Sequence, residues 1–286
     1  MAPQFLALCT ALSYAAANVS VRRGLRHSSA ATATLVSLIV HTVVLGLAVG
    51  LTGGVPGVAA LAVGLIAITG VLQTGMRLWH YTGIEKVGTS RAVTLRSTHP
   101  VFSVVIGVTI LQEQATPAIL IGTLLVVTGI IMTSWHADEQ ISGFRWRHLL
   151  FPMATALITG IVHPIRRYAM SIADEPLFFA AIVGAISLSC FSSTLTFPSM
   201  RERIVWNPNS VVPFIAAGVF ETSAVLLMLT AFVTGPVVLV SPIAATSPIW
   251  TLLMSVVFLR DLERVNRYAV LGTLFVVVGV IAIYLA

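Results

Sequence analysis

The sequence predicts an all-α integral membrane protein with ten transmembrane helices, arranged as two inverted repeats of five helices each. Three observations lead to this prediction: the composition, the continuity of the apolar segments and an internal repeat. Of the 286 residues, 57% are hydrophobic and only 9% are charged, whereas a soluble domain carries about 25% charged residues. Such a chain cannot cover its surface with polar groups, so it belongs in a lipid bilayer. We expect a multi-pass protein of the cell membrane (plasma or inner membrane).

Ten apolar segments account for almost the whole chain, because about ten spans of ~20 residues fit this length with short loops. Their apolar residues run continuously instead of alternating, which predicts helices and not membrane strands. Gly- and Pro-containing turns separate them. The expected helices are 4–21, 31–51, 57–82, 89–110, 116–135, 148–165, 176–197, 210–233, 236–259 and 267–285.

The chain repeats itself at a fixed distance. Pro100 and Glu113 are matched by Pro248 and Asp261, each 148 residues later, and ITGVLQT (68–74) is matched by AAGVFET at the same distance. The predicted units are residues 1–135 and 148–286, joined by a polar connection at 136–147. An odd number of spans in each unit inverts the second relative to the first, an arrangement typical of alternating-access transporters.

These matched residues also carry a family resemblance. Pro100, Glu113 and Gly122, with Pro248, Asp261 and Gly272, resemble the EamA-like branch of the drug/metabolite transporter superfamily. The resemblance covers nearly the whole chain and implies a ten-helix secondary carrier of a small metabolite, often an exporter. Asp261 differs from the commoner Glu but keeps the carboxylate, and Ser13-Tyr14 stands where many relatives have Trp-Gly.

The orientation in the membrane is predicted differently by two arguments. Lys and Arg gather in the loops after odd-numbered expected helices, and only Arg166 and Arg167 are expected in loops after even-numbered ones. The positive-inside rule then places both termini outside. The resemblance implies that both termini lie inside.

Glu221 is the clearest candidate for a functional group within a span. It lies in IAAGVFETSAVLLML without another charge for about ten residues on either side, and Gln73 is its partner in the repeat. Burial favours protonation of a carboxyl group, so Glu221 is our candidate for substrate contact and for proton coupling. The structural alternative is an ion pair with an arginine of the other repeat.

Basic residues of the first repeat form the other half of the predicted site. Gln73, Arg77 and His80 share one helix face, and Arg96 and His99 precede Pro100 at the same spacing. Pro100, like Pro248, is expected to kink its helix and free carbonyl groups for a cavity. Two arginines exceed one carboxylate, and an arginine fork suits acids, so we expect an anionic or zwitterionic substrate. The alternative is that the arginines reach the membrane interface.

For several further polar residues, the sequence gives weaker evidence of a role in the site. Tyr14 and Asn18 are expected to donate hydrogen bonds into the cavity, with helix packing as the alternative. His41 and His163 are single histidines for which packing is the default interpretation. Glu113 and Asp261 are expected to close the ends of the molecule, paired with Arg260 or Arg264.

The sequence therefore predicts a secondary transporter of a small polar metabolite, anionic or zwitterionic and amino-acid-like, working by efflux. The alternatives are a cation or multidrug exporter and an uptake carrier of the same fold. We expect no enzyme activity, since no nucleophile motif, phosphate loop or metal-ligand spacing is present. The expected partners are the substrate, the lipid bilayer and possible coupling protons, with no cofactor, metal or nucleic acid; the sequence leaves the oligomeric state open.

Overall fold

The protein is a bundle of helices, seen here in a computed structural model that describes residues 2–52, 54, 56–134, 145–258 and 267–285. These residues form helices and connections without a strand. Among the described residues, seven helical segments are long and apolar enough to cross a membrane, one of them the interrupted segment Val237–Met254, and shorter apolar segments lie at 117–132 and 271–284. The expected all-helical membrane class is therefore confirmed. The fourth and ninth expected helices, however, are each broken into two.

The elements follow one another along the chain with short connections. They are α1 (Pro3–Gly24), α2 (Ala30–Leu51), α3 (Ala60–Val87), α4 (Thr89–Arg96), α5 (Pro100–Thr109), α6 (Pro117–Ser134), the 3₁₀ turn η1 (Trp146–Leu149), α7 (Leu150–Ile172), α8 (Pro176–Thr194), α9 (Pro198–Arg201), α10 (Pro208–Thr234), α11 (Val237–Ala244), α12 (Ser247–Phe258) and α13 (Arg267–Tyr284).

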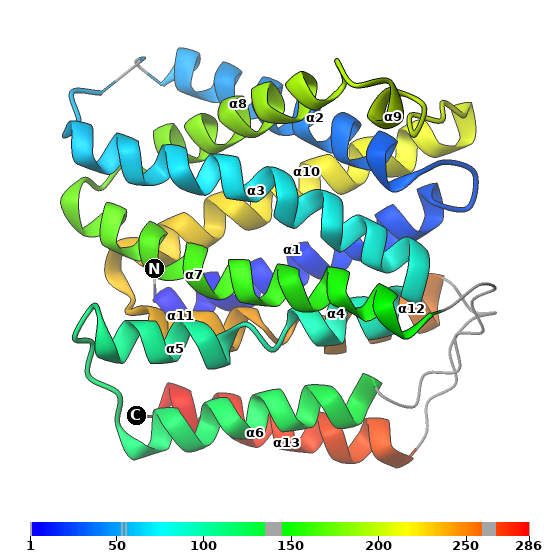
Figure 1. Cartoon of the computed structure of the whole chain (residues 1–286). Coiled ribbons are helices and arrows are strands. Elements are labelled where there is room, and N and C mark those ends of the chain that lie inside the picture. Colours follow the sequence, from blue (N-terminus) through cyan, green and yellow to red (C-terminus); the bar gives the residue numbers. More distant parts are fainter. Residues whose placement is uncertain (1, 53, 55, 135–144, 259–266, 286) are drawn as a thin grey trace.

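The long helices lie roughly parallel and form a layered bundle (Figure 1). Helices α2, α3 and α8 lie at one side of the bundle, and the pair α6 and α13 lies at the other. Helix α1 packs against α10, and α3 packs against both α7 and α8. The broken helices α4–α5 and α11–α12 lie between these outer layers, where protein surrounds their ends.

The two breaks occupy equivalent places in the chain. Helix α4 ends at Arg96 and α5 begins at Pro100, while α11 ends at Ala244 and α12 begins at Ser247, one residue before Pro248. Proline has no N–H to donate, but it fits the first turn of a helix, where that donor would lack a partner. Each proline therefore stands at the start of a new helix, where the sequence led us to expect a kink within a continuous one.

Helix α7 is longer than expected, and this corrects the assignment of two arginines to a loop. The expected helix ended at residue 165, but α7 continues to Ile172, so Arg166 and Arg167 lie within it. The side chain of Arg166 is directed into the bundle and is 1% exposed. The expectation was wrong because two adjacent arginines look like a helix end, although one of them faces the protein interior.

Glu113 joins the loop after α5 to the start of α11. The backbone N–H groups of Val237 and Val238 donate to its two carboxylate oxygens at 2.9 and 3.0 Å. Arg167 Nε lies 3.6 Å from Glu113 Oε1, and Arg167 Nη1 donates to the carbonyl of Phe232 at 2.7 Å. Glu113 thus stabilises a helix N-terminus with its negative charge. Its expected partners, Arg260 and Arg264, and the matching Asp261 lie outside the described residues.

Helices α6 and α13 approach closely because glycines face each other. A Cβ atom added to Gly122 would lie 2.7 Å from the carbonyl oxygen of Gly279, and one added to Gly129 would lie 2.5 Å from that of Gly272. Small residues allow this contact between membrane helices, where van der Waals packing replaces the hydrophobic effect. The four glycines are the ones that the sequence repeat matches between the two units.

We expect Gly122→Ala to destabilise the protein, because the new methyl group would meet backbone atoms of α13 that cannot rotate away. Gly64→Ala is the matched control, since a Cβ atom at Gly64 would meet nothing within 4 Å. Alanine in a helix is about 0.5–1 kcal/mol more favourable than glycine. Thermal unfolding in detergent should show a lower midpoint for Gly122→Ala and an unchanged or higher one for Gly64→Ala. Equal midpoints for the two variants would contradict the close packing.

Candidate functional site

A small internal cavity lies between the two helix breaks, with room for about one water molecule. Arg96, Ser97 and His99 line it from the first break, and Ala244 and Ser247 line it from the second. The remaining lining residues are Tyr14 from α1, Thr159 and His163 from α7 and Met228 from α10. The cavity therefore collects side chains from both sequence repeats. Of the predicted site residues, Tyr14, Arg96 and His99 line it.

Arg96 is the charged residue of this cavity. Its guanidinium carbon lies 4.7 Å from the centre of the Tyr14 ring, a distance suited to a cation–π contact. The Arg96 side chain is half-buried, and Tyr14 is buried. No described carboxylate lies within ion-pair distance of Arg96. A buried or half-buried guanidinium without a fixed anion is suited to binding an acid group.

Arg77 and Glu221, by contrast, are paired with each other. Arg77 Nε lies 3.7 Å from Glu221 Oε1, and both side chains are buried. The Tyr81 hydroxyl donates to Glu221 Oε2 at 3.4 Å. Arg77 also reaches Ser37 Oγ and His41 Nδ1, both at 3.5 Å. Neither Arg77 nor Glu221 lines the small cavity in this conformation.

The other predicted residues, Asn18, Gln73 and His80, make contacts away from the cavity. His80 Nε2 donates to Asn18 Oδ1 at 2.8 Å, and Asn18 Nδ2 donates to Thr251 Oγ1 at 3.4 Å. Gln73 Oε1 accepts from Arg166 Nη2 at 3.1 Å. The first contact joins α1, α3 and α12, and the second joins α3 to α7. These residues surround the centre of the bundle without lining its cavity.

Sequence analysis missed the role of Arg166 and undervalued His163. Arg166 is buried, and Nε also reaches Thr69 Oγ1 at 3.5 Å. His163 lines the cavity and contacts Ser241 Oγ at 3.1 Å through Nδ1. If the expected helix had been extended past residue 165, the three-residue spacing of His163 and Arg166 would have placed both residues on one helix face. The sequence could not identify Ser241 as the partner of His163, because serines are frequent in the spans of this chain.

The charges of the centre do not balance among the described residues. Arg77, Arg96 and Arg166 bring three positive charges, and Glu221 brings one negative charge that Arg77 already binds. Charged groups are costly inside a membrane and usually face a partner or a cavity. Within the described residues, no group of three His, Cys, Asp or Glu side chains could hold a metal ion. Among the described residues, the centre of the bundle therefore carries a net positive charge.

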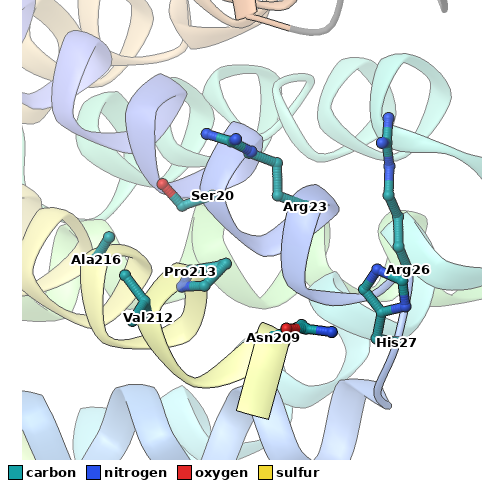
Figure 2. A pocket seen from close by; sticks show the side chains of 8 residues that line it. All are labelled: Ser20, Arg23, Arg26, His27, Asn209, Val212, Pro213 and Ala216. Atoms are coloured by element: carbon teal, nitrogen blue, oxygen red, sulfur yellow. The ribbon is translucent and has the colours of Figure 1, made fainter. Parts of the chain in front are cut away.

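A second, open pocket of about 420 Å³ lies at one end of the bundle. Figure 2 shows that its side chains come from the end of α1, the turn that follows it and the start of α10. Arg23, Arg26 and His27 are exposed there, beside Asn209. This pocket lies at the end of the bundle where Lys and Arg gather, here called the basic end. It is separate from the cavity between the helix breaks.

Comparisons with known proteins agree with this architecture. No curated protein matches the chain. A solved structure titled only as the crystal structure of a protein is 16% identical, with a TM-score of 0.77 over 99% of this chain and 96% of that one. This likeness concerns the fold alone. The sequence model of the EamA-like transporter family matches residues 1–135 and 146–285. The chain is therefore a multi-pass membrane protein that belongs to the EamA-like transporter family.

Proposed function

We propose that this protein is a secondary carrier of a small anionic or zwitterionic metabolite, which it exports by alternating access. The observation that carries this proposal is Arg96, whose guanidinium lies over Tyr14 beside the central cavity without a described carboxylate partner. Arginine binds carboxylate and phosphate through two parallel hydrogen bonds. An acid group of the substrate would supply the negative charge that the site lacks.

The arrangement of the helices supports alternating access. Helices α4 and α11 are related by a shift of 148 residues at both ends, and the prolines after them by the same shift. If α4–α5 and α11–α12 each count as one crossing, the chain crosses the membrane ten times and the two repeats are inverted. A site between such repeats can open to either side by a rocking motion. The small cavity corresponds to a closed intermediate of this cycle.

A cation or multidrug exporter is the competing function. It would use Glu221 to bind the cation, but this carboxylate is paired with Arg77 and Tyr81 in the structure. A cation in the central cavity would also meet Arg96. The charge of the site therefore favours the acid carrier.

We expect Arg96→Ala to reduce export of an acidic metabolite by at least about tenfold, because a hydrogen bond to a charged group contributes about 1.5–3 kcal/mol. The measurement is a comparison of metabolites inside and outside cells that express wild type or the variant at equal levels. Arg23→Ala, at an exposed position outside the cavity, is the matched control and should export normally. Equal export of a cationic compound by wild type and Arg96→Ala would instead support the cation exporter.

We expect Glu221→Gln to abolish or uncouple transport while the protein still folds. Glutamine keeps a hydrogen-bond acceptor for Tyr81 but removes the counter-charge of Arg77, which would then be free to bind the acid group of the substrate and hold it. Thermal unfolding and membrane expression check the fold, and the same metabolite comparison checks transport. Wild-type transport with unchanged pH dependence would rule out a role for Glu221 in the cycle.

We also infer that the termini lie outside the cell. The C-terminal end of α1 lies at one end of the bundle in Figure 1, and both termini lie toward the other. The basic end carries Arg22, Arg23, Arg26, Lys86, Arg91, Arg145, Arg147, Arg201 and Arg203. The described loops at the other end hold no Lys or Arg, because Arg166 and Arg167 lie within α7. The guanidinium of Arg167 reaches this end, but it is bound to Glu113 and to the end of α10. Lys and Arg next to spans favour the cytoplasmic side.

Cysteine labelling tests this orientation. In a chain whose native Cys9 and Cys190 are replaced by Ser, Gln114→Cys places a thiol at the terminal end and His27→Cys places one at the basic end; both positions are exposed. A membrane-impermeant maleimide should label Gln114→Cys in intact cells and His27→Cys only after the cells are opened. The reverse pattern would place the termini inside, as the family resemblance implies.

A further inference from the structure

Two histidines meet at one serine beside the central cavity. His99 Nδ1 and His163 Nδ1 each lie 3.1 Å from Ser241 Oγ, and Ser103 Oγ lies 2.7 Å from the same oxygen. The two imidazole rings have centroids 4.7 Å apart and are nearly perpendicular. All four side chains are buried. His99 and Ser103 come from the first repeat, and His163 and Ser241 come from the second.

The hydrogen bonds of this cluster can accommodate one additional proton. A serine hydroxyl donates one hydrogen bond and accepts two, while the Nδ1 atom of neutral histidine either donates or accepts. With both histidines neutral, Ser241 can donate to one Nδ1 and accept from the other and from Ser103. If the accepting Nδ1 gains a proton, both histidines donate to Ser241, and its hydroxyl turns to Ser103.

Ser103 has a place for its own proton in this second arrangement. Its hydroxyl lies 3.4 Å from the carbonyl oxygen of Pro100 and can donate to it. The two Nδ1 atoms and the two serine hydroxyl groups then all still have partners. This matters because a buried polar group without a partner costs about 1–3 kcal/mol. Rotation of two hydroxyl groups is enough to convert one arrangement into the other.

The charges around the histidines decide when the proton can bind. Helices α5, α6, α11 and α12 have no ionisable side chain along their length. Away from their ends, the other central helices carry Tyr14 on α1, Arg77, His80 and Tyr81 on α3, Arg96 on α4, Arg166, Arg167 and the exposed Tyr168 on α7, and Glu221 on α10. Arg22, Arg23, Glu85, Lys86 and Arg91 lie in the terminal turns of α1, α3 and α4. Arg96 and Arg166 each lie one helical turn or less in sequence from a histidine of the cluster, and Glu221 is bound by Arg77. The empty site thus repels an added proton, and an anion at Arg96 would reverse this repulsion.

We propose that His99 and His163, linked through Ser241, form a proton-binding site that fills when an acid group binds at Arg96, so that one proton travels with the substrate. This inference rests on the proposed function and names the group that carries the proton. It assigns this role to the histidine pair because Glu221 already has Arg77 as a fixed partner. The proton moves from water to an imidazole nitrogen and is released to water on the other side, so no other reactant is needed.

Asparagine at these positions gives a sharp test. The Asn side chain keeps a polar atom near the place of Nδ1, which can donate to or accept from Ser241, but it does not take up a proton. The variants are His99→Asn, His163→Asn and the double variant. His27→Asn is the matched control, because His27 is exposed at the basic end and outside the cluster. Thermal unfolding shows which variants keep the fold.

The first measurement detects the proton directly, independently of transport. Protein with ¹⁵N-labelled histidine is reconstituted in bilayers, and its imidazole signals are recorded in chloride and in saturating acetate, a minimal carboxylate probe, as the pH is lowered. Signals lost in each single variant identify His99 and His163. We expect one imidazolium per molecule in this pair, formed at a higher pH in acetate than in chloride. Two neutral histidines throughout folded conditions in both salts, or no effect of acetate, would overturn the proposal.

The second measurement uses the acidic metabolite found by the export comparison. Transport by wild type and by His27→Asn should depend on pH, whereas the double variant should lose this dependence. If the double variant transports with the wild-type pH dependence, the histidine pair is not the coupling site, although the carrier function stands. If no metabolite is transported but the shared imidazolium is present, the proposed function fails while the proton site itself is supported.

Discussion

The arrangement of the helices depends most on the contacts that three arginines make inside this membrane protein. A charged side chain in the middle of a bilayer costs several kcal/mol unless it has partners or water. Here each partner comes from another helix: Glu221 on α10 binds Arg77 of α3, Gln73 on α3 binds Arg166 of α7, and Tyr14 on α1 lies beneath Arg96 of α4. The contacts that solvate the arginines are therefore the same contacts that fix the positions of α1, α3, α4, α7 and α10 around the cavity.

The two helix breaks bring polar chemistry to the same place by a different route. Interrupted backbone is tolerated at membrane depth only where protein or water surrounds it. The breaks meet this condition because the long helices enclose them, and the cavity lies where they face each other. Because α6 and α13 pack through their glycines at one side of the bundle, the broken helices need not supply all the contacts that hold the two repeats together.

The sequence alone predicted the membrane class, the family and the shared helix face of Gln73, Arg77 and His80. These features can be read from composition, from matched motifs and from the spacing of residues along one helix. The sequence also located both breaks through Pro100 and Pro248, although it suggested kinks instead of new helices. It could not reveal that Arg166 faces inward, because adjacent arginines are typical of helix ends. It also could not pair His99 with Ser241, which lies 142 residues away and is one of many serines in the chain.

The carboxylate of Glu113 has a consequence for the way the molecule can move. It binds the first amides of α11, while the neighbouring Arg167 binds the last carbonyl groups of α10, so one carboxylate and one guanidinium hold three segments at one rim of the bundle. Each such hydrogen bond contributes only about 1 kcal/mol in net terms, because water can replace it. Water can therefore replace any one of these contacts without a large energetic cost. The side chains of Arg167 and Glu113 are only 23% and 9% exposed, so dissolved ions screen the attraction between them much less than that of a pair on an open surface. The strength of this contact therefore changes little with the salt content of the medium.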